Sequence, residues 1–260
     1  DVGVLYMEVG GWMPMCGHDT IGVGTALVEC GMVKVAEPYT ELKLDTAAGV
    51  VTLKIKVSGQ KAETVSFVNA PAFMLRSQET VDTKEYGKVT VDIGYGGNFY
   101  AIVDVQAVGL DLKRENYRSL IDAGNLLKTY INEQLPVVHP EKPFINETTH
   151  IEFIGPSDTP GVYNKDAVVF PPGDIDRSPC GTGTSARCAQ LVAEGKLRVG
   201  ESFVHESFIG SLFRCKAVKE TEVAGIPAVI PEVTGSAYMM GMSTFFLDPD
   251  DPFPIGFQLS

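Results

Sequence analysis

Hydrophobic residues recur at helical spacing in three stretches of the chain and predict three helices. The clearest amphipathic stretch is 117–134, whose apolar positions fall every third or fourth residue on one face. Two other helices are predicted to start directly after Cys16 and Cys180 and to end at Gly31 and Gly195, because glycine commonly follows the last turn of a helix. The stripe of 117–134 is predicted to pack on the core through Leu120, Ile121, Leu127, Ile131 and Leu135.

Short runs rich in β-branched and aromatic residues, separated by turns of Gly, Pro and Ser, predict strands along most of the remaining chain. Many strands with a few helices predict an α+β fold. The Ala-Pro-Ala sequence at 70–72 is interpreted as a crossing between two domains. The glycine cluster at 94–98 predicts a tight turn and not a phosphate loop, because it lacks GxGxxG spacing and leads into a strand. The predicted strands are 2–9, 42–44, 49–57, 63–69, 87–93, 99–105, 149–154, 167–170, 203–207, 212–218, 228–233 and 237–242.

The composition describes a globular protein with a packed core. Of 260 residues, 44% are hydrophobic and 21% are charged, which suits one large domain or two of ordinary size. The net charge of −12 argues against nucleic acid or an anionic membrane as the partner. No apolar run approaches the roughly 20 residues of a membrane-spanning helix. The N-terminus shows no signal-peptide pattern.

Five cysteines form neither a CxxC pair nor a regular spacing, so the sequence indicates no disulfide framework and no zinc site. Cys30, Cys188 and Cys215 lie among apolar neighbours and are interpreted as small buried hydrophobic residues. His18 stands two residues after Cys16 and the other three histidines are scattered, so no metal site is predicted. Free thiols are typical of a reducing compartment, and the predicted location is the cytoplasm.

The other two cysteines begin two copies of one motif. Cys16 and Cys180 are each followed by glycine, and a threonine stands four residues after each, at Thr20 and Thr184. A helix N-terminus has unpaired N–H groups and a partial positive charge, which favour a carboxylate ligand and predict a lowered thiol pKa. If the two helix starts face one cavity, an anionic substrate lies between two sulfurs. That arrangement is suited to moving a proton.

These motifs, MCGH at 15–18 and DRSPCGTGTS at 176–185, resemble those of the proline racemase family, and the likeness extends along the whole chain. The resemblance implies a diaminopimelate epimerase-like fold, with two pseudo-symmetric domains that each curl a mostly antiparallel sheet around a central helix. It implies a first domain of 1–71 with 243–260, lacking its N-terminal part here, and a second domain of 72–242. It also implies a homodimer.

The resemblance assigns roles to residues of this chain. Cys16 and Cys180 are the acid–base pair of a racemase that needs no cofactor, and Asp176 receives the positive nitrogen of the substrate. From the residues alone, Asp176 is better explained as a turn or cap residue. For the two aromatic residues named at the end of this paragraph, a place among ordinary core residues is the alternative. The implied substrate-binding residues are Gly17, His18, Gly181 and Thr182 for the carboxylate, and Phe170 and Tyr100 for the ring.

The predicted reaction is racemisation of proline, and 4-hydroxyproline epimerisation is the alternative. Dehydratases of 3-hydroxyproline resemble this chain but carry a hydroxyl residue at the position of Cys180. The apolar ring of Phe170 favours proline, because burying an unpaired hydroxyl costs about 1–3 kcal/mol. His205 and Ser207 would serve a substrate hydroxyl if they face the cleft. A non-catalytic amino-acid-binding protein and a thiol–disulfide protein are the other classes that the sequence allows.

Overall fold

The computed structural model describes residues 1–253 except 9–10, 14 and 48. The described residues form three α-helices, α1 (Gly17–Glu29), α2 (Tyr117–Gln134) and α3 (Gly181–Ala193), and two short 3-10 helices, Val105–Val108 and Arg114–Asn116. The three predicted helices are therefore confirmed. The strands are β1 (Val2–Gly3), β2 (Tyr6–Glu8), β3 (Gly11–Met13), β4 (Tyr39–Thr46), β5 (Gly49–Ser58), β6 (Lys61–Val68), β7 (Ala72–Thr83), β8 (Gly87–Tyr95), β9 (Phe99–Asp104), β10 (Thr148–Gly155), β11 (Asn164–Phe170), β12 (Asp174–Ile175), β13 (Ser202–Glu206), β14 (Leu212–Val223) and β15 (Ile226–Gly235).

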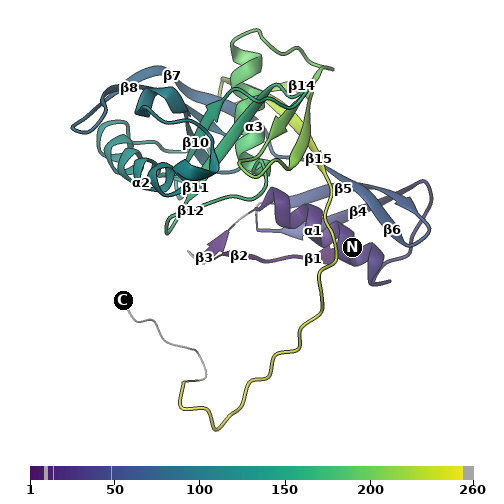
Figure 1. Ribbon diagram of the computed structural model, residues 1–260. Helices are drawn as coiled ribbons and strands as arrows, with labels where there is room; N and C mark the ends of the chain where they lie inside the picture. The colour runs from purple at the N-terminus through teal and green to yellow at the C-terminus, as the bar shows by residue number, and fades with distance from the viewer. Residues whose placement is uncertain (9–10, 14, 48, 254–260) are drawn as a thin grey trace.

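Eight strands close into a mixed barrel around α3. The ring runs β7-β8-β9-β10-β11-β13-β14-β15 and closes because β15 also pairs with β7. The pairs β9–β10 and β11–β13 are parallel and the others are antiparallel. Inside the ring, α3 contacts β7, β8, β9, β14 and β15, and every residue from 181 to 191 is buried. The α+β prediction is confirmed (Figure 1).

Strand alternation gives the barrel two different faces. On β9, Ala101 belongs to the large apolar cluster under α2, whereas Tyr100 and Ile102 pack toward Cys180 and Ala186 of α3. Helix α2 contacts β10, β7 and β11, so it covers the outside of the barrel (Figure 1). Side chains that point inward on these strands therefore reach the start of α3.

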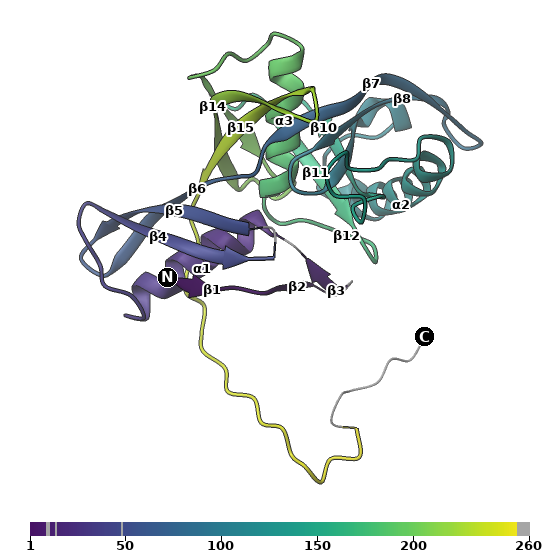
Figure 2. The ribbon, with the colours of Figure 1, turned by 180° about the vertical axis from the view of Figure 1, so that it is seen from behind.

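A smaller sheet extends from the barrel and carries α1. Its order is β1-β4-β5-β6, and β6 pairs with residues 232–235 of β15. Helix α1 packs on β6 and β5, and its buried Ile21, Leu27 and Val28 share one apolar cluster with residues of these strands. Figure 2 shows α1 lying against this sheet, beside the barrel.

Three predictions about strands need correction. Strand β7 was not predicted, because polar residues and two register shifts between Met74 and Glu79 break its alternation. The predicted strand 237–242 is wrong, since residues 236–253 contain no strand or helix and run away from β15 (Figure 2). The predicted strand 2–9 is divided into β1 and β2, and its last residue lies outside the described part of the chain. Residues 254–260, which we assigned to the first domain, also lie outside it.

Candidate active site

The N-termini of α1 and α3 touch through two glycines. A Cβ atom at Gly17 would lie 2.6 Å from the Cα of Gly181, and a Cβ at Gly181 would lie 2.6 Å from the Cα of Gly17. Real Cβ atoms essentially never approach closer than 3.0 Å, so no other residue fits here without a backbone shift. The ring of Phe67 closes the same space. This contact brings the two N-cap residues, Cys16 and Cys180, to one place.

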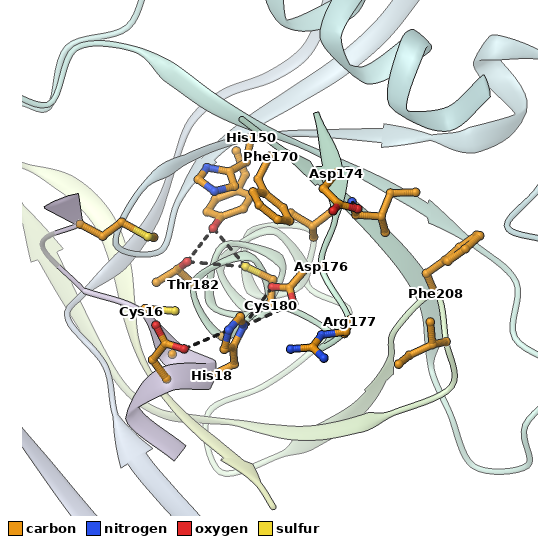
Figure 3. A pocket seen from close by; sticks show the side chains of 18 of the residues that line it. Cys16, His18, His150, Phe170, Asp174, Asp176, Arg177, Cys180, Thr182 and Phe208 are labelled. Atoms are coloured by element: carbon orange, nitrogen blue, oxygen red, sulfur yellow. Dashed lines mark hydrogen bonds and ion pairs between the residues drawn. The ribbon is translucent and has the colours of Figure 1, made fainter. Parts of the chain in front are cut away.

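Both cysteines line one cavity of about 530 Å³. It lies between the start of α1, the start of α3 and the ends of β11 and β12 (Figure 3). The two cysteines have similarly low exposures, 9% for Cys16 and 7% for Cys180. The structure brings together every predicted site residue in the lining, namely Cys16, Gly17, His18, Tyr100, Phe170, Asp176, Cys180, Gly181 and Thr182.

The sulfur of Cys180 is surrounded by hydrogen-bond donors. Its backbone has φ 58° and ψ 115°, an uncommon conformation that costs about 1–3 kcal/mol and aims the side chain into the cavity. The backbone N–H of Gly183 donates to the sulfur at 3.4 Å, and the Tyr100 hydroxyl lies 3.2 Å from it. That hydroxyl also lies 2.6 Å from Oγ1 of Thr182. Tyr100 was predicted to form an apolar wall around the substrate ring. In the structure its hydroxyl group faces the sulfur of Cys180.

Burial raises the pKa of both thiols. For Cys180, the charge of Asp176 adds to burial, while the Tyr100 hydroxyl and the Gly183 amide act in the opposite direction. For Cys16, the carboxylate of Asp19 adds to burial. The prediction that a helix N-terminus lowers the thiol pKa is therefore wrong for these two residues. The helix amides do favour the thiolate, but the loss of water outweighs them.

His18 lies between two carboxylates. Its Nε2 is 3.1 Å from Asp19 Oδ1, and its Nδ1 is 3.3 Å from Asp176 Oδ1. Burial lowers the pKa of His18, but the hydrogen bonds and charges of the two aspartates prevail and raise it to about 10. The ring is therefore an imidazolium at neutral pH. Asp176 also accepts hydrogen bonds from the backbone N–H and the hydroxyl of Ser178.

Histidine 150 is a cavity residue that the sequence reasoning missed. His150 stacks on Tyr100 with ring centroids 4.8 Å apart, and it lies near Phe170 in the cavity wall (Figure 3). Burial lowers its pKa to about 4, so the imidazole is neutral. Its place in a predicted strand was visible in the sequence, but the inward direction of its side chain was not.

The two residues considered as partners for a substrate hydroxyl do not line the cavity. His205 is fully buried behind α3, with Nδ1 3.0 Å from Thr184 Oγ1 and Nε2 2.9 Å from Asn164 Nδ2. Ser207 is also buried, and its hydroxyl lies 2.7 Å from that of Ser211. Other lining residues that the sequence reasoning did not select include Met7, Met13, Tyr117, Asp174, Arg177 and Phe208.

The fold also gathers potential metal ligands that lie far apart in the sequence. Two groups of described residues bring three donor atoms within 4.8 Å of one another. The wide spacing of the histidines along the sequence therefore did not predict which side chains meet in the fold. The groups are Cys16, His18 and Asp19 in the cavity, and Glu152, Asp166 and His205 inside the barrel. Among the described residues, no helix has the length and apolar character needed to span a bilayer.

Comparison with known proteins gives consistent matches. A family model described as "Proline racemase" matches residues 1–258. A 4-hydroxyproline 2-epimerase of Streptosporangium roseum is 48% identical over 259 residues, covering 100% of this chain and 78% of that protein. A proline racemase of Clostridioides difficile is 41% identical over 259 residues, covering 100% and 77%. The crystal structure of a hydroxyproline epimerase from Agrobacterium vitis, with bound trans-4-hydroxy-L-proline, has a TM-score of 0.92 at 37% identity, covering 99% of this chain and 74% of that one.

Proposed function

The chain belongs to the proline racemase family of racemases and epimerases, and on that premise we propose that it inverts the α-carbon of a proline-type amino acid. The observation that carries this proposal is the meeting of two helix N-termini, each capped by a cysteine, at one cavity. Cys16 and Cys180 are the acid–base pair in this proposal.

Inversion at the α-carbon needs a base on one face and an acid on the other. One sulfur, as thiolate, takes the α-proton, and the C–H electron pair moves into the carboxylate. The other sulfur, as thiol, delivers its proton to the opposite face. A single passage thus inverts the carbon without turning the substrate over, and the titration of the two linked thiols belongs to the pair.

The carboxylate of the substrate takes up negative charge when the α-proton leaves. Backbone N–H groups at the start of α1 (Gly17, His18) and at the start of α3 (Gly181, Thr182) are proposed to bind it. They are fixed in place by the helices, so they stabilise the developing charge without reorganisation. Loss of one such donor typically raises a barrier by about 2.7–4 kcal/mol.

Asp176 is proposed to receive the positive nitrogen of the substrate. The His18 imidazolium and the two donors of Ser178 hold the Asp176 carboxylate in place. His18 therefore has two roles in this proposal: its backbone N–H binds the substrate carboxylate, and its ring orients Asp176.

Two substrates fit the proposed chemistry. The ring of Phe170 supports proline, as the sequence predicted. His150 supports 4-hydroxyproline, because a neutral imidazole beside Phe170 can pair with a ring hydroxyl that would otherwise be buried alone. Relatives named for 4-hydroxyproline also match this chain closely. We therefore prefer 4-hydroxyproline as substrate and keep proline as the second candidate.

The two helix-bearing units are proposed to be pseudo-symmetric domains. Each has a helix of 13 residues that follows a Cys-Gly step, and the expected division is 1–71 with 243–260 against 72–242. The homodimer implied by the resemblance also stays a prediction.

The test is proton NMR of each substrate in deuterated water with the reduced protein. We expect the α-proton signal of trans-4-hydroxy-L-proline to disappear as the second epimer forms. Cys16→Ser and Cys180→Ser should each reduce formation of the second epimer by at least about 1,000-fold, because one face of the carbon loses its acid or base. A fully active single variant would contradict the two-thiol mechanism. Thermal stabilisation by the amino acid without any exchange would identify a binding protein instead.

A further inference from the structure

The two sulfurs of the cavity have different neighbours. Cys180 is met by donors, the Gly183 amide at 3.4 Å and the Tyr100 hydroxyl at 3.2 Å. Cys16 makes no side-chain capping hydrogen bond with its helix. After burial, the charge of the Asp19 carboxylate raises the pKa of its thiol, while the backbone N–H of Asp19 acts in the opposite direction. A hydroxyl donor stabilises a thiolate, whereas the charge of a neighbouring carboxylate favours the neutral thiol. The surroundings therefore distinguish the two residues.

The hydroxyl of Tyr100 has one proton and two neighbours. Oγ1 of Thr182 lies 2.6 Å from it, and the threonine hydroxyl can donate to the tyrosine oxygen. The proton of Tyr100 is then directed at the sulfur. Burial keeps the tyrosine neutral, because it raises the pKa of Tyr100 well above the ordinary value. Stacking on His150 fixes the ring, so the donor is held in place.

We propose that Tyr100 is a catalytic residue, whose hydroxyl donates a hydrogen bond to the sulfur of Cys180 and makes Cys180 the thiolate and Cys16 the thiol of the resting pair. This inference deepens the proposed function and rests on it. The α-proton facing Cys180 moves to that sulfur, and the proton of Cys16 moves to the opposite face of the carbon. Afterwards Cys16 is the thiolate, and the Tyr100 hydrogen bond favours the return to the starting distribution.

Tyr6 provides a matched control beside the other helix. Its buried hydroxyl lies 2.6 Å from Oγ1 of Thr20 near the start of α1, but it makes no hydrogen bond with either cysteine among the described residues. Tyr6→Phe and Tyr100→Phe thus remove the same hydroxyl from strand residues that contact the first turns of α1 and α3, and only the second removes a contact with sulfur.

The first readout is alkylation by iodoacetamide, followed by peptide mass mapping at several pH values. Cys16 and Cys180 are similarly buried, so their rates report mainly on thiolate content. In the unsubstituted protein Cys180 should react first. Tyr100→Phe should slow its alkylation by at least about 10-fold, because a hydrogen bond to a charged group contributes about 1.5–3 kcal/mol. Tyr6→Phe should leave that rate unchanged. Faster reaction at Cys16 in the unsubstituted protein, or an unchanged rate in Tyr100→Phe, overturns the proposal.

The second readout is the pH dependence of α-proton exchange. Loss of the Tyr100 donor should shift the acidic limb of kcat/KM to higher pH, whereas Tyr6→Phe should not move it. The ionisable groups that face this pair also include Asp176, Asp19, His18, Glu152 and His150. An unshifted limb in an active Tyr100→Phe protein overturns the proposal. If the unsubstituted protein exchanges no α-proton, the proposed function fails, and the alkylation rates still decide which sulfur Tyr100 stabilises.

Discussion

At the scale of single residues, the site depends on the absence of two side chains. Gly17 and Gly181 let the first turns of α1 and α3 approach to van der Waals contact, and this contact sets the separation of the two cysteines. Glycine is required here by the neighbouring backbone, not by an unusual φ angle, because neither residue has a positive φ.

Substitution of Gly17 by alanine tests this dependence. The new Cβ would meet the Cα of Gly181 at 2.6 Å, and overpacking of this kind costs about 1–3 kcal/mol. We expect a lower melting temperature and at least about 100-fold slower α-proton exchange, because the two sulfurs move apart. Gly22→Ala is the control, since a Cβ there meets no atom within 4 Å and alanine stabilises a helix by about 0.5–1 kcal/mol. Equal behaviour of the two variants would contradict the argument.

At the scale of elements, the inner face of the barrel wall behind α3 is polar. Glu152 on β10 and Asp166 on β11 are fully buried, and their carboxylate oxygens make no hydrogen bond among the described residues. Nε2 of His205 lies 3.8 Å from Glu152 and 3.6 Å from Asp166. Burial raises the pKa of Glu152 to about 8, with the charge of Arg187 acting in the opposite direction. The carboxyl group is thus largely protonated at neutral pH.

This raised pKa predicts a pH dependence of stability. Because folding raises the pKa of Glu152 from 4.5 to about 8, its contribution to stability is complete below pH 4.5 and is lost as the pH rises through about 8. The contribution of Glu152 to the free energy of unfolding in urea should therefore fall between about pH 5 and about pH 8. Glu152→Gln, which cannot ionise, should lose at least about 1 kcal/mol less over the same range. An identical slope in both proteins would show that Glu152 is not the group responsible.

At the scale of the whole molecule, one strand sets the position of the two halves of the cavity. Cys16 and His18 lie at the start of α1, which packs on the smaller sheet. Cys180, Tyr100 and Asp176 belong to the barrel and to the start of the helix inside it. Strand β15 pairs with β6 through residues 232–235 and with β7 through residues 228–229. A ligand in the cavity therefore contacts both units and should stabilise their arrangement.

A planar five-membered ring carboxylate should stabilise the protein against heat. Loss of the α-proton makes the α-carbon planar, so such a compound resembles the state that the site is proposed to bind most tightly. At about 100 times its dissociation constant it would add about 2.7 kcal/mol to the stability. Cys16→Ser and Cys180→Ser should keep this effect, because backbone amides hold the carboxylate. The matched carboxamide should raise the melting temperature less, and an equal shift would argue against carboxylate binding by the helix N-termini.

The sequence by itself determined the helices and nine of the residues that line the cavity. The amphipathic spacing of 117–134 and the two Cys-Gly helix starts are local signals, and local backbone preferences decide where a helix begins. The motif at 176–185 placed Asp176 and Cys180 correctly in the lining. Strand β7 escaped detection because bulges break its period.

Only the tertiary structure decided the chemistry at the two sulfurs. Strand alternation separates two faces but does not say which one lines a cavity, so His150 and His205 could not be told apart before folding. Likewise, the hydroxyl of Tyr100 reaches Cys180 across 80 residues of sequence. The thiol pKa follows burial and charges from distant segments, and these outweigh the local helix N-terminus. Local preferences act within a few residues, whereas desolvation and electrostatics depend on every segment that packs around a group.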